Sequence, residues 1–162
     1  MNRALRILGA LEDAILASLL GLMIIMATAQ IILRNVFDSG ISWADPALRV
    51  AVLWVGMLGA MAATRDDRQI SVDALSRYLP DSWKPRVRVL TDLFTAGVAA
   101  FFAWHAGRLV IEDHGSGMTV FASVPVWACE VILPIAVGII AIRYGLYAVK
   151  HARESLAGES NQ

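Results

Sequence analysis

Four apolar stretches, each close to the length that crosses a lipid bilayer, dominate this sequence of 162 residues. A transmembrane helix needs about 20 mostly apolar residues to cross a hydrocarbon core about 30 Å thick. Because lipid offers the backbone no hydrogen bonds, each stretch is predicted to be a helix. We therefore predict one all-α membrane domain over residues 1–162, with spans near residues 14–33, 46–64, 89–110 and 125–147.

The composition agrees with a membrane protein. Hydrophobic residues make up 57% of the sequence and charged residues 17%, whereas soluble domains carry about 25% charged residues. The formal net charge is +0, so the chain lacks the basic field that holds nucleic acid. The single cysteine of the sequence, Cys129, excludes a disulfide framework and a CxxC site within it.

The first apolar stretch has an alternative interpretation as a cleavable signal peptide. Two arginines precede it, and Ala27-Thr28-Ala29 imitates a cleavage site. The acidic pair Glu12-Asp13, however, lies where such a signal is normally basic. We therefore expect a retained transmembrane helix.

The distribution of lysine and arginine predicts the orientation, because cytoplasmic loops carry the positive excess. With the N-terminus in the cytoplasm, eleven of the 14 basic residues fall on the cytoplasmic side. The remaining three, Arg34, Arg49 and Arg108, fall on the other side. We predict four spans with both termini in the cytoplasm.

The longest polar connection lies between the second and third apolar stretches. Within it, Val72, Leu75 and Leu79 share one helical face, and basic residues flank that face. This pattern is typical of an amphipathic helix that lies among the phospholipid headgroups, here near residues 70–79. An ordinary amphipathic linker is the alternative.

Small residues recur at helical spacing in the spans, where close backbone approach supplies packing that the hydrophobic effect does not. Gly56, Gly59 and Ala60 form such a face in the second span, and similar faces recur in the third and fourth. We expect these faces to pack helices of this chain together, with a partner protein as the alternative.

Ionisable residues inside a membrane are costly and therefore informative. Most of them have a partner of opposite charge four residues away, which reduces the cost. These pairs are Asp45 with Arg49, Arg88 with Asp92, and Arg108 with Glu112.

Glu130 has no such local partner. We predict that it forms an ion pair with Arg49 or Arg108 across the bundle, and proton coupling is the alternative role. Pro134 lies four residues later, so its missing N–H frees the Glu130 carbonyl and should kink the fourth helix.

No catalytic or cofactor motif is present in the sequence. A glycine-rich phosphate loop, a zinc-ligand spacing and a nucleophile elbow are all missing. His105, His114 and His151 fall at unmatched depths for a pair of haem ligands. We expect no enzyme activity and no bound cofactor or metal.

Two groups of residues in the second and fourth stretches form a recognisable pattern. The fourth stretch contributes Val124-Pro125-Val126-Trp127 and Pro134. The second stretch and its flanks contribute Trp43, Arg49, Trp54, Leu58-Gly59-Ala60, Arg65, Ile70-Ser71-Val72-Asp73, Leu75 and Pro80. Together these residues resemble a known family, the small membrane (Q) subunit of tripartite ATP-independent periplasmic (TRAP) transporters.

The resemblance implies a non-enzymatic scaffold subunit of a secondary transporter in the bacterial inner membrane. Its expected partners are a larger membrane subunit, which holds the substrate and ion sites, and a periplasmic substrate-binding protein. Solute uptake would be driven by an ion gradient, usually sodium.

The resemblance also implies roles for individual residues. Trp43, Asp45 and Arg49 would lie at the periplasmic edge near a partner, and Arg65 and Asp73 would frame the interfacial helix. Residues that would pack the scaffold or its partner interface are Trp54, Gly56, Gly59, Ala60 and Trp127, although Trp43 and Trp127 also fit simple membrane-interface anchors.

Two other function classes remain open at this point. A small proton-coupled multidrug exporter, acting as a homodimer, would use Glu130 as its coupling site. A membrane anchor of a redox enzyme would bind haem or quinone.

Overall fold

A computed structural model describes residues 3–65, 83–121 and 123–159. In these residues the chain has four helical segments long and apolar enough to cross a membrane, as predicted. The segments are Gly9–Val36, Ala44–Ala63, Arg86–Ser116 and Val126–Ser155. The predicted interfacial segment at residues 70–79, which includes Asp73, lies outside the described residues.

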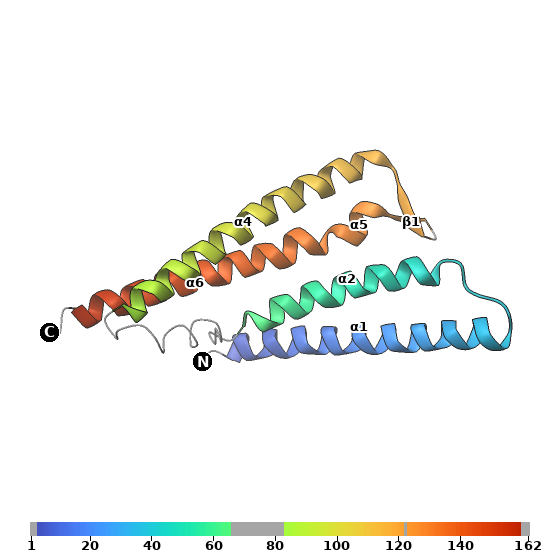
Figure 1. The fold of residues 1–162 in the computed structure, drawn as a ribbon, viewed down its shortest axis with the longest axis horizontal. Coiled ribbons are helices and arrows are strands. Elements are labelled where there is room, and N and C mark those ends of the chain that lie inside the picture. The colour runs from blue at the N-terminus through green and yellow to red at the C-terminus, as the bar shows by residue number, and fades with distance from the viewer. Residues whose placement is uncertain (1–2, 66–82, 122, 160–162) are drawn as a thin grey trace.

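The described residues are almost entirely helical (Figure 1). A short two-stranded sheet joins the third span to the fourth. In chain order the elements are α1 (Arg3–Val36), α2 (Ala44–Ala63), α4 (Lys84–Ser116), β1 (Thr119–Phe121), β2 (Val124–Pro125), α5 (Val126–Glu130) and α6 (Ile132–Glu159).

Three helices extend beyond the predicted spans. Helix α1 begins at Arg3, α4 ends at Ser116 and α6 continues to Glu159. The apolar pattern marks only the part that suits lipid, whereas the flanking leucine, alanine, arginine and glutamate residues are themselves good helix formers. Helix α4 stops where Gly117 takes a left-handed conformation with φ of 64°, the usual glycine C-cap.

The fourth span is interrupted near its start, as the position of Pro134 predicts. Helix α5 ends at Glu130 and α6 begins at Ile132. Proline has no N–H to donate to the carbonyl four residues earlier, which here is that of Glu130. The interruption sets α5 off from α6, next to β1 and β2 (Figure 1).

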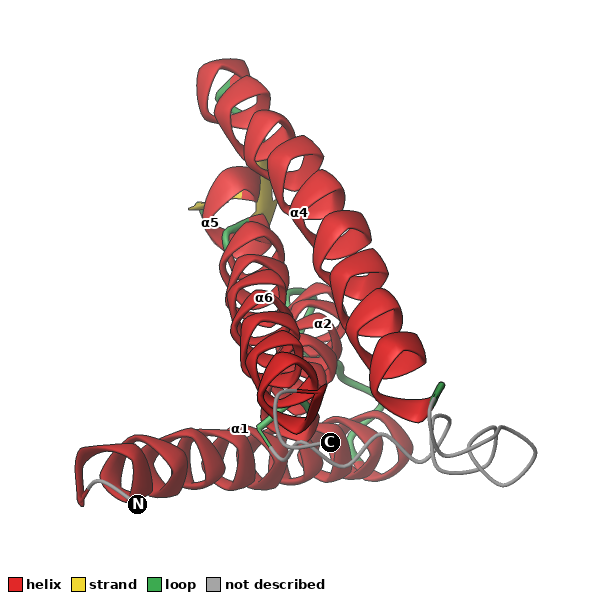
Figure 2. Cartoon of the chain, turned by 90° about the vertical axis from the view of Figure 1, so that its left-hand side faces the viewer, coloured by secondary structure: helices red, strands yellow, loops and turns green. Residues whose placement is uncertain are grey.

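The helices form two hairpins, α1 with α2 and α4 with α6. The hairpins lie close together at the end that holds both chain termini, here named the terminal end, and separate toward β1 and β2, here named the hairpin end (Figure 1). Helix α1 crosses the other helices at a steep angle (Figure 2). Among the described helices, α4 and α6 have the most extensive packing, with Ala99, Ala136 and Ala148 buried.

Candidate functional site

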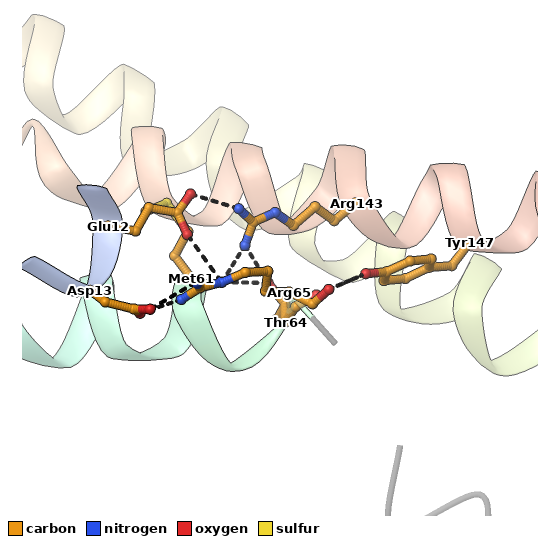
Figure 3. A network of polar contacts seen from close by, with 7 residues as sticks. All are labelled: Glu12, Asp13, Met61, Thr64, Arg65, Arg143 and Tyr147. Atoms are coloured by element: carbon orange, nitrogen blue, oxygen red, sulfur yellow. Dashed lines mark hydrogen bonds and ion pairs between the residues drawn. The ribbon is translucent and has the colours of Figure 1, made fainter. Parts of the chain in front are cut away.

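Arg143 of α6 joins three helices at the terminal end (Figure 3). Its Nη2 atom lies 2.7 Å from Oε1 of Glu12 on α1. Its Nη1 atom donates hydrogen bonds to the carbonyl of Met61, in α2, and to Oγ1 of Thr64, at 3.4 Å. A single guanidinium group therefore links α1, α2 and α6.

Arg65, just after α2, adds a second link to the same corner (Figure 3). Its guanidinium donates two hydrogen bonds to the Asp13 carboxylate, one of them 3.0 Å long from Nη1 to Oδ2. The Tyr147 hydroxyl of α6 donates to the Arg65 carbonyl at 2.8 Å. Gly9 leaves room for this arrangement, since a Cβ atom there would lie 2.6 Å from Nη1 of Arg65.

We name the polar residues that Arg143 and Arg65 link together the terminal clamp. Two carboxylates, of Glu12 and Asp13, are balanced there by the two arginines, which lowers the cost of placing charge beside a membrane span. The sequence placed Arg65 at the edge of the second span but did not pair Glu12 with Arg143. The sequence did contain one indication of this contact, because Arg143 is an isolated arginine within the fourth apolar stretch and therefore needs a partner. The clamp residues are Glu12, Asp13, Thr64, Arg65, Arg143 and Tyr147.

A second polar link is buried between α4 and α6. Nδ1 of His151 lies 2.7 Å from Oδ2 of Asp92, and the two side chains are 5% and 1% exposed. The predicted partner of Asp92 was Arg88 on the same helix, and the structure corrects that expectation. Asp92 faces α6, which supplies the histidine.

A third link lies beside the interruption of the fourth span. Nε1 of Trp54, on α2, donates a 2.9 Å hydrogen bond to the carbonyl of Cys129 on α5. A regular helix would offer that carbonyl the N–H of Leu133, four residues on. The Trp54 indole therefore satisfies a backbone group next to the helix break and ties α2 to α5.

Replacing Trp54 by phenylalanine should destabilise the bundle by about 1–2 kcal/mol, because phenylalanine keeps an aromatic ring but has no N–H to donate to the Cys129 carbonyl. Thermal unfolding in detergent measures the change, with the exposed Trp104→Phe on α4 as the matched control. Equal stability of the two variants would show that the indole hydrogen bond contributes nothing.

Glu130 lies beside another acid rather than beside an arginine. Its carboxyl group is next to that of Asp113 on α4, and its Oε2 atom is buried without a hydrogen-bond partner. Arg108 instead faces Glu112, with 3.7 Å between Nη2 and Oε1. Among the described residues, neither Arg49 nor Arg108 forms an ion pair with Glu130.

The helical rotation of α4 explains this arrangement. Asp113 follows Arg108 by five residues, which turns it by about 140° around the helix. Arg108 lies on the exposed side of α4, while Asp113 points toward α5. The ion-pair prediction for Glu130 compared distances along the helices, which do not give the side of the helix on which each residue lies.

The predicted residues at the start of α2 lie at the surface of the hairpin end. Trp43, Asp45 and Arg49 are exposed, and the predicted local pair between Asp45 and Arg49 is not formed among the described residues. Trp127 of α5 is half-buried, with its ring centroid 5.2 Å from that of His114.

The small-residue face of α2 does not pack against another described helix. Gly56 and Ala60 are exposed, and a Cβ atom at Gly56 or Gly59 would meet nothing within 4 Å. The expectation of packing within the chain is therefore wrong for α2. In α4 the predicted face is buried at Ala99. A Cβ atom at Gly107 of α4, or at Gly138 or Gly145 of the face predicted in α6, would meet nothing within 4 Å.

Gln30 is a structural residue that the sequence reasoning did not identify. It is 8% exposed, and its amide makes two hydrogen bonds with the Ile41 backbone. Nε2 donates to the carbonyl at 3.2 Å, and Oε1 accepts from the N–H at 3.3 Å. These two hydrogen bonds fix the connection between α1 and α2. The sequence feature that could have identified Gln30 is the presence of a polar amide within an apolar stretch.

Comparison with known proteins identifies the family. Residues 23–154 match the family model described as the DctQ component of tripartite ATP-independent periplasmic transporters. The chain is 32% identical over 93 residues to a protein of Haemophilus influenzae described as a TRAP transporter small permease, covering 57% of this chain and 53% of that protein.

A second relative is the sialic acid TRAP transporter permease protein SiaT of another Haemophilus influenzae strain. It is 29% identical over 112 residues, covering 62% of this chain and 18% of that protein. The chain thus spans about half the length of the first relative and under a fifth of the second. The family match covers most of this four-span chain, which therefore belongs to the DctQ components of tripartite ATP-independent periplasmic transporters and is a multi-pass inner-membrane transporter subunit, not an enzyme.

Proposed function

We propose that this chain is the fixed scaffold of a TRAP transporter, holding a larger membrane subunit and helping a periplasmic substrate-binding protein to dock. The match to SiaT carries the proposal, because the matched stretch is 18% of a longer permease. A segment similar to this chain thus occurs in one polypeptide with a much larger remainder.

The structure supports a scaffold in two ways. The terminal clamp, the Asp92–His151 pair and the Trp54 hydrogen bond fix the helices to one another. At the same time, the most apolar 18-residue segments of α1 and α2 are largely uncovered. In each, only 6% of the segment is buried within the chain. Rigid links with uncovered apolar faces suit a subunit that packs against another membrane protein.

The docking role rests on the hairpin end. With both termini in the cytoplasm, as the positive-inside rule predicts, this end faces the periplasm. Trp43, Asp45 and Arg49 are exposed there, and the small face of α2, at Gly56, Gly59 and Ala60, is open for a partner. The ion gradient, of sodium in this proposal, would act through the larger subunit.

Co-purification tests this function. The tagged chain, extracted from its native host in mild detergent, should carry one larger polytopic membrane protein, identified by intact mass. Arg49→Glu should weaken that recovery, whereas Arg153→Glu, an exposed change at the terminal end, should not.

The contrary outcome is equally specific. Recovery only as a small homo-oligomer, with proton-driven export that Glu130→Gln abolishes, would replace the scaffold with the exporter. Haem absorbance in the purified sample would point to a redox anchor instead.

A further inference from the structure

One face of α4 is exposed along its length and carries ionisable groups within a membrane span. The helical period places these residues on one side, directly opposite Asp92 and Ala99, which are buried against α6. We name this face the α4 outer stripe. Its residues are Leu90, Phe94, Phe101, His105, Arg108 and Glu112.

The lower part of the stripe, toward the terminal end, is apolar and aromatic. Leu90 is 68% exposed, Phe94 is 71% and Phe101 is 62%. The Phe101 ring lies against His105, with 4.4 Å between ring centroids. Large flat side chains in a row, with nothing of this chain over them, offer contact area to a second helix.

The upper part of the stripe is polar. Arg108 pairs with Glu112, and both side chains remain largely exposed, at 61% and 67%. His105 lies five residues, about 8 Å along the helix, inside the span predicted to end near residue 110, and Arg108 lies two residues inside it. Both positions fall within the apolar helical segment Arg86–Ser116.

Such groups are costly when they face hydrocarbon, and in membrane proteins they usually face protein or a water-filled cavity. The long arginine side chain can reach toward the headgroups, but the short histidine side chain cannot. A stripe that combines an exposed histidine, an exposed ion pair and exposed aromatic rings is therefore better suited to protein than to lipid.

We propose that the α4 outer stripe is the surface that binds the larger membrane subunit, an inference that rests on the proposed function. The partner helix would place apolar side chains against Phe94 and Phe101. It would place a carboxylate or another hydrogen-bond acceptor near His105 and Arg108. Such a partner removes the cost that lipid would impose on both groups.

The comparison with SiaT favours a larger subunit over a second copy of this chain. A stretch similar to this chain forms 18% of that longer permease. In such a polypeptide, a segment like this one lies beside a much larger membrane protein. The photo-crosslinking experiment below distinguishes the two occupants.

The decisive variants remove polarity from the stripe. His105→Leu, and the double variant Arg108→Leu with Glu112→Leu, make the face more apolar without leaving an unpaired charge. If lipid covers the stripe, these changes should leave assembly unaffected or improve insertion. If the larger subunit covers it, recovery of that subunit in mild detergent should fall by about tenfold.

Matched controls separate this effect from misfolding. Arg153→Leu with Glu154→Leu removes one charge of each sign from exposed positions of α6, and it should leave recovery unchanged. Each variant must retain its helical circular dichroism spectrum and elute as a single species. A photo-crosslinking residue at Phe101 reports contacts directly, and one at Ile142 on α6, which is 65% exposed, is its control.

The proposal predicts a Phe101 adduct with the larger subunit. An adduct with a second copy of this chain, or unchanged recovery of the Leu variants, overturns the assignment of the stripe while leaving the scaffold function intact. Failure of the unaltered chain to recover any larger subunit overturns both.

Discussion

Replacing His151 by leucine is expected to lower the free energy of unfolding by about 3 kcal/mol, the largest effect of any single change considered. The Asp92 carboxyl group is 1% exposed and lies 2.7 Å from Nδ1 of His151. Leucine leaves that carboxyl group buried without this partner. Unfolding in mixed detergent micelles, followed by circular dichroism, measures the loss.

Two further variants make the result specific. The double variant Asp92→Leu with His151→Leu should be more stable than His151→Leu alone, because no buried charge remains. Arg153→Leu, exposed two residues further along α6, should change stability by less than about 0.5 kcal/mol. A His151→Leu protein as stable as this control would contradict the structural role of the pair.

The second large effect is expected for Arg143→Lys, at about 2 kcal/mol of lost stability. Lysine keeps the positive charge but cannot present the planar fork of arginine. It therefore cannot contact Glu12, the Met61 carbonyl and Thr64 together, as Arg143 does. The contact between α1 and α6 should loosen, because Glu12 lies on α1 and Arg143 on α6.

Arg34→Lys on α1 is the matched control, since Arg34 is exposed and forms no ion pair among the described residues. A double-mutant cycle should show coupling between Arg143→Lys and Glu12→Gln. The double variant should lose less stability than the sum of the losses in the two single variants. Strictly additive effects would indicate that the 2.7 Å ion pair is not formed in the membrane.

Sequence reasoning predicted the fourth-helix interruption but not its consequence. Proline acts on the backbone of its own helix, so Pro134 alone locates the break between α5 and α6. The donor that satisfies the Cys129 carbonyl comes from Trp54, 75 residues earlier. Nothing in the local pattern of either segment identifies that contact.

For the ionisable residues, too, the contact within one helix was predicted and the contacts between helices were not. The i,i+4 pair of Arg108 with Glu112 was predicted correctly, because both groups lie on one helix at fixed spacing. Asp92 was assigned to Arg88 but pairs with His151, and Glu130 lies by Asp113. These contacts depend on how far each helix is rotated about its axis, a quantity that the apolar pattern of a membrane span barely restricts.

By itself the sequence determined the number of spans, their approximate positions and the helix break, because hydrophobic length and proline geometry are local properties of the chain. Only the tertiary structure decided which charges meet, that the small face of α2 stays open while α4 and α6 pack closely, and that α4 turns its ionisable stripe outward. The physical reason is that all sides of these helices are apolar, so rotation and tilt are set by contacts between helices.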